Sequence, residues 1–74
     1  MMGRRNFKAR KVVKALVQIG CKVVRNTDHG VIVENPRNNK STNVPTHRET
    51  LAVWIYHNII RQLDIDKDEL ERNL

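Results

Sequence analysis

The sequence predicts an α+β fold in which two helices pack on one face of a three-stranded antiparallel sheet. Residues 7–19 and 49–63 place apolar side chains every three or four positions, as amphipathic helices do. Between them, residues 21–45 are rich in β-branched and turn-forming residues. A chain of 74 residues is sized for one domain with a thin core, so residues 1–74 are expected to form a single domain.

The first helix is expected over residues 7–19. Gly20 follows it directly and suits the left-handed position that ends many helices. The helical spacing is carried by Ala9, Val12, Val13, Leu16 and Ile19.

Three strands are expected next. Residues 21–25 and 31–35 form a predicted hairpin, and the polar turn 26–30 joins them. A second turn, 36–40, leads to a weaker third strand at 41–45. Because Pro45 has no amide hydrogen to donate, this strand should end there or lie at an edge of the sheet.

The second helix is expected over residues 49–63, and a short helix should begin at Lys67. Asp66 and Glu69 have capping-box spacing, in which Asp66 accepts from the third amide and Glu69 reaches back. Ile65 and Leu70 are placed as a hydrophobic staple around that cap. The expected order is helix, three strands, helix and short helix, with the second face of the sheet open to a nucleic acid.

The charge distribution favours a polyanionic partner. The net charge is +6 and the pI is about 10.1. Residues 1–61 carry 12 Lys or Arg and 3 acidic residues, whereas residues 62–74 carry 2 and 5. A basic body of this kind is typical of proteins that bind nucleic acid phosphates, although a merely solvated charged surface is the alternative.

The residue inventory disfavours several other classes. Cys21 is the only cysteine, so no internal disulfide can form, as is usual in a reducing cytoplasm, where we expect the protein to act. No apolar run approaches the roughly 20 residues of a membrane helix, and no export signal is seen. The three histidines and one cysteine lack metal-ligand spacing, so we expect no metal and no cofactor.

Imidazole remains as the group for proton transfer. In RNA, a 2′-hydroxyl can attack the adjacent phosphorus if a side chain removes its proton or protonates the leaving oxygen. His29 lies in the first turn and is either catalytic or an ordinary turn residue, while His47 either approaches a ligand or caps the second helix. His57 is expected to be structural, and Trp54 and Tyr56 are expected to be core or partner contacts.

These residues resemble the HicA-like mRNA interferase toxins over most of the chain, from about residue 7 to residue 70. Members of that family have a helix ending in Gly, a G-F-x-x-V-R strand, a G-S-H turn, an apolar strand and a V-P-x-H segment. The corresponding residues here are Gly20 to Arg25, then Thr27-Asp28-His29, then Val31-Ile32-Val33 and Val44-Pro45-Thr46-His47. Thr27-Asp28 stands where the family has Gly-Ser.

The resemblance implies a double-stranded-RNA-binding-like fold and metal-independent cleavage of mRNA by a toxin of a type II toxin-antitoxin pair. It implies that His29 is the catalytic residue and that a HicB-like antitoxin is the partner. The side chains we expect to contact RNA are Arg4, Arg5, Lys8, Lys11, Lys22, Arg25 and His47.

The residues alone leave two other functions open. One is a non-catalytic module, on the same scaffold, that binds RNA or an antitoxin. The other is a small DNA-associated regulator, for which the sequence lacks a clear recognition helix, because the second helix is mostly apolar.

Overall fold

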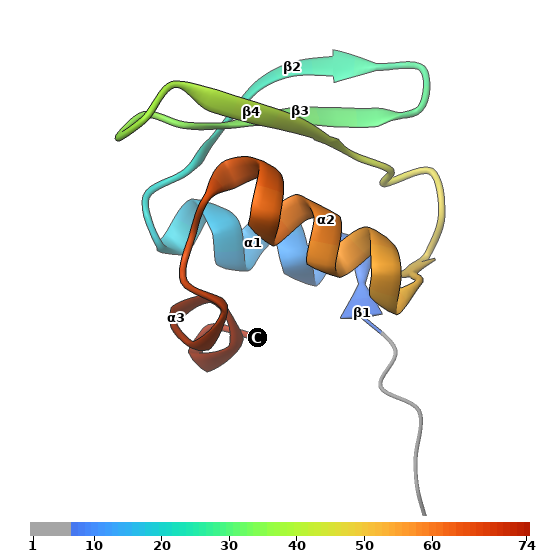
Figure 1. The fold of residues 1–74 in the computed structure, drawn as a ribbon. Helices are drawn as coiled ribbons and strands as arrows, with labels where there is room; N and C mark the ends of the chain where they lie inside the picture. Colours follow the sequence, from blue (N-terminus) through green and yellow to red (C-terminus); the bar gives the residue numbers. More distant parts are fainter. Residues whose placement is uncertain (1–6) are drawn as a thin grey trace, which may run out of the picture.

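The structure, a computed structural model, describes residues 7–74 and contains three helices and five strands in that range (Figure 1). Arg4 and Arg5, which we expected to contact RNA, lie outside the described residues. The elements in chain order are β1 (Phe7–Lys8), α1 (Ala9–Gln18), β2 (Lys22–Thr27), β3 (Gly30–Asn35), β4 (Lys40–Val44), β5 (Thr50–Leu51), α2 (Val53–Leu63) and α3 (Lys67–Arg72).

The predicted fold class is confirmed. Strands β2, β3 and β4 form an antiparallel sheet in that order, and α1 and α2 lie together on one face of it (Figure 1). The short helix α3 contacts α1 at the end of the molecule remote from β1. The other face of the sheet carries no helix among the described residues.

Both long helices begin later than the sequence predicts. Phe7 pairs with Leu51 and Lys8 with Thr50, so these residues form a small second sheet, β1-β5, instead of helical turns. The Ala9 amide then donates to the Glu49 carbonyl at 2.9 Å. This pairing joins segments about forty positions apart. Helical periodicity is a local pattern, so it cannot indicate a pairing of this kind.

The end of α1 follows the prediction. Gly20 has φ +109°. Its amide donates to the Val17 carbonyl, and the Cys21 amide donates to the Leu16 carbonyl. These two bonds satisfy carbonyls that the last helical turn would otherwise leave unpaired.

The first hairpin turn is tighter than the predicted 26–30. Asn26 pairs with Val31 and Thr27 with Gly30, so only Asp28 and His29 remain between the strands. Polar composition predicts the turn but does not reveal that its first two residues continue the ladder. Strand β4 ends at Val44, directly before Pro45, as expected.

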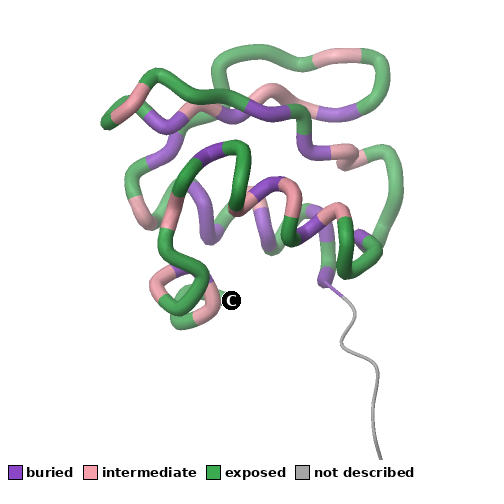
Figure 2. The backbone as a smooth tube through the Cα atoms, viewed as in Figure 1, coloured by how far each residue is buried: buried purple, intermediate pink, exposed green. Residues whose placement is uncertain are grey.

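The core lies between the sheet and the helices (Figure 2). Its largest fully buried side chains include Tyr56, Leu16, Ile59, Leu63 and Leu70. Tyr56 is therefore a core residue, as expected, but Trp54 is 67% exposed and is not. The two residues differ by two positions on α2, so they occupy different faces of the helix, and apolar character alone did not separate them.

Half of the predicted capping box of α3 is present: within residues 7–74 the Asp66 side chain caps the helix, but no hydrogen bond runs from the Asp66 amide to the Glu69 side chain. The Asp66 carboxylate accepts from the Asp68 amide at 3.1 Å, one position earlier than the third amide. Leu70 is fully buried, and Ile65 packs against the core, as the staple requires. The cap and the staple together hold α3 against the remaining structure.

Candidate active site

The β2–β3 turn presents His29 at its tip. The Thr27 hydroxyl lies 3.1 Å from the Gly30 carbonyl, to which it donates, and accepts from the His29 amide at 3.3 Å. It also lies 3.2 Å from the Asn43 side-chain oxygen. Thr27 therefore ties the two ends of the turn together, and its hydroxyl lies in contact with Asn43 of β4.

Gly30 brings this turn into direct contact with the end of β4. Its φ is +147°, and a Cβ at this position would lie 2.0 Å from the Val44 carbonyl oxygen and 2.8 Å from the Pro45 Cα. Only glycine permits both the backbone angle and the close approach. His29 is thus held beside the chain that leads from Pro45 to His47.

His29 and His47 meet at this point. The Nδ1 atom of His47 lies 2.8 Å from the His29 carbonyl oxygen, and the two ring centroids are 6.0 Å apart. A carbonyl oxygen only accepts hydrogen bonds, so Nδ1 of His47 carries the hydrogen. Both histidines are exposed to solvent, and the sequence did not predict that they would meet.

A hollow beside His47 is lined mainly by cations. We call it the basic hollow, and its lining residues are Lys8, Arg10, Lys11, Thr46, His47, Arg48 and Glu49. Lys8, Lys11 and His47 were predicted site residues, whereas Arg10 and Arg48 were missed. Arg48 follows His47 directly, and Arg10 belongs to the N-terminal run of cations. Their positions in the sequence could therefore have indicated both residues as site candidates.

One cation of the basic hollow is paired. Lys8 Nζ lies 3.0 Å from a Glu49 carboxylate oxygen, and both side chains are largely exposed. An exposed ion pair of this kind contributes little to stability and exchanges readily for another anion. Lys8 therefore remains able to bind a phosphate.

The two predicted cations on β2 lie apart from each other. Arg25 is opposite Ile32, two residues before Thr27, whereas Lys22 is opposite Glu34 at the other end of the strand. Thr27 follows Lys22 by five positions along the strand, a span of about 17 Å. Arg25 is therefore close to the turn, and Lys22 is not.

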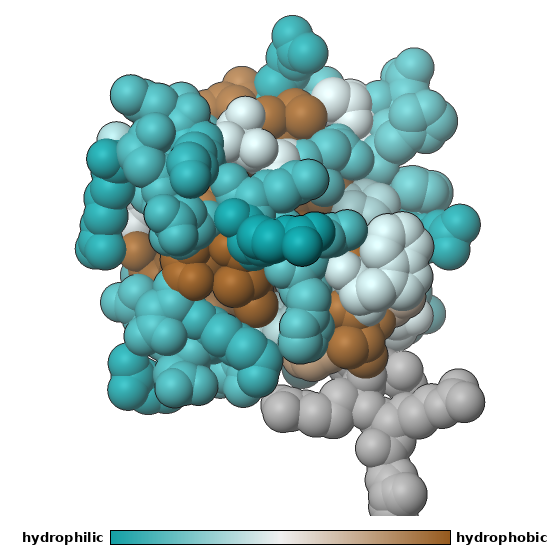
Figure 3. All heavy atoms as spheres, in the orientation of Figure 1, coloured by the Kyte–Doolittle hydropathy of each residue, from teal (hydrophilic) through white to brown (hydrophobic). Residues whose placement is uncertain are grey.

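Figure 3 shows hydrophilic side chains over most of the face it presents, with apolar patches between them.

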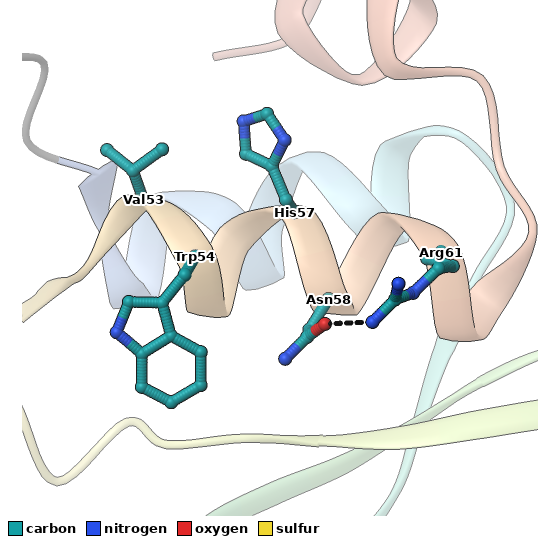
Figure 4. A pocket seen from close by; sticks show the side chains of 5 residues that line it. All are labelled: Val53, Trp54, His57, Asn58 and Arg61. Carbon is teal, nitrogen blue, oxygen red and sulfur yellow. Dashed lines mark hydrogen bonds between the residues drawn. The ribbon is translucent and has the colours of Figure 1, made fainter.

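Another surface hollow runs along α2 (Figure 4). It is lined by Val53, Trp54, His57, Asn58 and Arg61, with Arg61 donating to the Asn58 side-chain oxygen at 2.6 Å. Neither His29 nor His47 lines this hollow. We therefore place the candidate chemistry at the turn, where the two imidazoles lie beside the basic hollow, and not at the hollow along α2.

The remaining chemical groups do not suggest another site. Cys21 is buried, as expected for a core residue; burial raises the pKa of its thiol, with a smaller raising effect from Glu69, while Arg37 opposes them. The thiol is thus held in its protonated, weakly nucleophilic form. Among residues 7–74, no group of three or more His, Cys, Asp or Glu side chains is arranged to hold a metal ion.

Comparison with known protein families identifies the family of this chain. A family model described as the HicA toxin of bacterial toxin-antitoxin matches residues 9–65. The protein belongs to the HicA toxin family. The predicted resemblance is confirmed, and the match to HicA toxins includes the β2–β3 turn, His47 and all of α2.

HicA family membership makes this protein a toxin-type component of a toxin-antitoxin pair. No curated protein and no solved structure matched the chain. None of the helices in residues 7–74 of this HicA family member is long and apolar enough to cross a membrane.

Proposed function

We propose that this HicA family member is an endoribonuclease that cleaves mRNA without a metal ion, with His29 as a catalytic residue. The observation that carries the proposal is the exposed His29 imidazole on a turn that Gly30 and Thr27 hold in place beside the basic hollow. Membership of a toxin family supports the same conclusion. The protein acts in the cytoplasm, where mRNA is found.

The chemistry follows from the groups at the turn. The 2′-hydroxyl of RNA attacks the neighbouring phosphorus, and an imidazole transfers a proton in the transition state. The cations near the site, Arg25 on β2 and those of the basic hollow, stabilise the charge that builds on the phosphate. These groups account for the reaction without a metal.

The partner we propose is a HicB-like antitoxin that covers the turn. The body of the toxin is strongly basic, so an acidic partner surface would compete directly with RNA for the same cations. The antitoxin then inhibits RNA cleavage simply by occupying the site.

Replacement of His29 by alanine is expected to slow cleavage of single-stranded RNA in EDTA by about 10²–10⁴-fold. The imidazole is exposed, so its loss removes a proton-transfer group without opening the core. The rate of cleavage of a labelled RNA by each purified protein measures the effect. Growth after tightly controlled expression of each protein gives a second measurement.

His57→Ala is the matched control, because His57 is an exposed histidine on α2 and should be replaceable without loss of activity. Equal cleavage by the wild type and by His29→Ala would contradict the assignment of His29. If the wild type cuts no RNA and is harmless to growth, the protein is a non-catalytic member of the family.

Arg48→Ala is expected to weaken RNA binding at every sequence tested and to reduce the slope of log affinity against log salt by about one unit. Arg48 lines the basic hollow and is exposed, so its loss removes one phosphate contact. Titration of His29→Ala protein carrying this change, at several salt concentrations, measures binding without cleavage. Lys67→Ala on α3 removes the same charge outside the hollow and should leave the slope unchanged. An unaltered slope for Arg48→Ala would place the RNA elsewhere.

A further inference from the structure

We propose that His47 is a second catalytic residue, the general base that takes the proton of the 2′-hydroxyl, and that His29 is the general acid. This proposal rests on the proposed ribonuclease function and deepens it. Its basis is the contact between the two histidines, which come from different segments of the chain.

The hydrogen bond at His47 determines which of its nitrogens is reactive. Nδ1 donates to the His29 carbonyl at 2.8 Å, so in the neutral ring the lone pair is on Nε2. A backbone carbonyl cannot release Nδ1 by changing its own protonation state. The ring is thus oriented, with a basic nitrogen on its far edge, in the arrangement that a general base requires.

The spacing of the rings suits a single phosphodiester. Their centroids are 6.0 Å apart and the ring planes are inclined by 70°. In a displacement at phosphorus, the attacking and leaving oxygens lie roughly in line on opposite sides, and each needs a group within about 2.6–3.2 Å. Two imidazoles at this separation can serve the two oxygens of one phosphate, whereas one imidazole would have to serve both.

The surroundings place the phosphate at the pair. His47 is itself part of the lining of the basic hollow, so a backbone phosphate drawn to Arg48 or Lys11 lies next to its ring. Gly30 holds the turn against Pro45, which keeps His29 and His47 together. Both rings are exposed, so a strand of RNA has access to them.

The proposed step balances as follows. Nε2 of His47 accepts the proton of the 2′-hydroxyl as that oxygen forms its bond to phosphorus. The bond from phosphorus to the 5′-oxygen breaks, and that oxygen takes a proton from the His29 imidazolium. The products are a 2′,3′-cyclic phosphate and a free 5′-hydroxyl, and proton exchange with water restores both histidines.

The experiment compares four variants on two RNA substrates of one sequence. The variants are His29→Ala, His47→Ala, His47→Asn and the control His57→Ala. One substrate has an ordinary phosphodiester at the cleavage site, and the other has sulfur in place of the bridging 5′-oxygen. Because a thiol is far more acidic than an alcohol, the sulfur leaves without a general acid. The asparagine amide can still donate to the His29 carbonyl, but it cannot act as a base.

On the ordinary substrate, His29→Ala and both His47 variants should each be slower than the wild type by about 10²–10⁴-fold. On the sulfur substrate, His29→Ala should approach the wild-type rate, and both His47 variants should remain slow.

Three results would overturn the role of His47 while leaving the proposed function intact. Wild-type cleavage by His47→Asn alone would show that His47 only positions the turn. If the sulfur substrate restores the cleavage rate of His47→Ala, His47 is the general acid. If His47→Ala cleaves the ordinary substrate at the wild-type rate, His47 takes no part in the mechanism. A wild-type protein that cuts neither substrate would overturn the proposed function itself.

Discussion

Replacement of Gly30 by alanine is expected to lower the free energy of unfolding by about 3–5 kcal/mol, because backbone strain and steric overlap act together. Gly30 has φ +147°, and the new Cβ would lie 2.0 Å from the Val44 carbonyl oxygen. The obstructing atoms are backbone atoms of β4 and Pro45, which cannot move aside as a flexible side chain would. The turn must therefore separate from β4, and the contact between His29 and His47 must break. Urea unfolding measures the first effect, and RNA cleavage by the folded fraction measures the second.

Gly20→Ala is the matched control for this prediction. Gly20 also has a positive φ, +109°, but a Cβ there would meet nothing within 4 Å. Its replacement should cost only the backbone term, about 1–2 kcal/mol, and should leave RNA cleavage by the folded protein unchanged. If Gly30→Ala is no more destabilising than Gly20→Ala, the close approach to β4 does not matter to the fold.

Replacement of Tyr56 by alanine is expected to destabilise the protein by about 3–5 kcal/mol. Tyr56 is fully buried, its ring stacks on Phe7 with 3.8 Å between centroids, and its hydroxyl donates to a Glu71 carboxylate oxygen at 3.2 Å. One side chain therefore connects β1, α2 and the C-terminal helix. A domain of this length has a total stability of roughly 4–11 kcal/mol, so the variant should be partly or wholly unfolded at 37 °C.

Two further variants separate the contributions at this position. Tyr56→Phe keeps the ring and removes the hydroxyl, so it should cost only about 1 kcal/mol. Trp54→Ala removes a larger side chain two positions away, but that side chain is 67% exposed, and the change should stay within about 0.5 kcal/mol. Thermal unfolding followed by circular dichroism measures all three. A Trp54→Ala loss as large as that of Tyr56→Ala would mean that Trp54 is packed in solution.

The local features of the fold could be predicted because their causes are local. Gly20 ends α1 and Asp66 caps α3 through hydrogen bonds to residues only a few positions away. The hydrophobic periodicity that predicts α1 and α2 is likewise contained within each segment. These interactions depend on neighbours in the sequence, so the sequence displays them directly.

The elements that prediction placed wrongly depend on residues distant in the sequence. Phe7 and Lys8 leave the predicted helix because Leu51 and Thr50 pair with them. Asn26 and Thr27 leave the predicted turn because the ladder with β3 continues. Non-local pairing competes with local propensity, and its outcome depends on the completed packing.

At the candidate site, the residue types followed from the sequence and their arrangement did not. The sequence alone determined an α+β chain with a basic body, imidazole as the available proton-transfer group, and a histidine in the first hairpin turn. Only the tertiary structure brought His47 to the His29 carbonyl and placed Arg10 and Arg48 beside it. The physical reason is non-local pairing: the β3–β4 ladder and the close approach of Gly30 to Val44 and Pro45 bring His29 to His47, and the bond from the Ala9 amide to the Glu49 carbonyl brings α1 to the same segment.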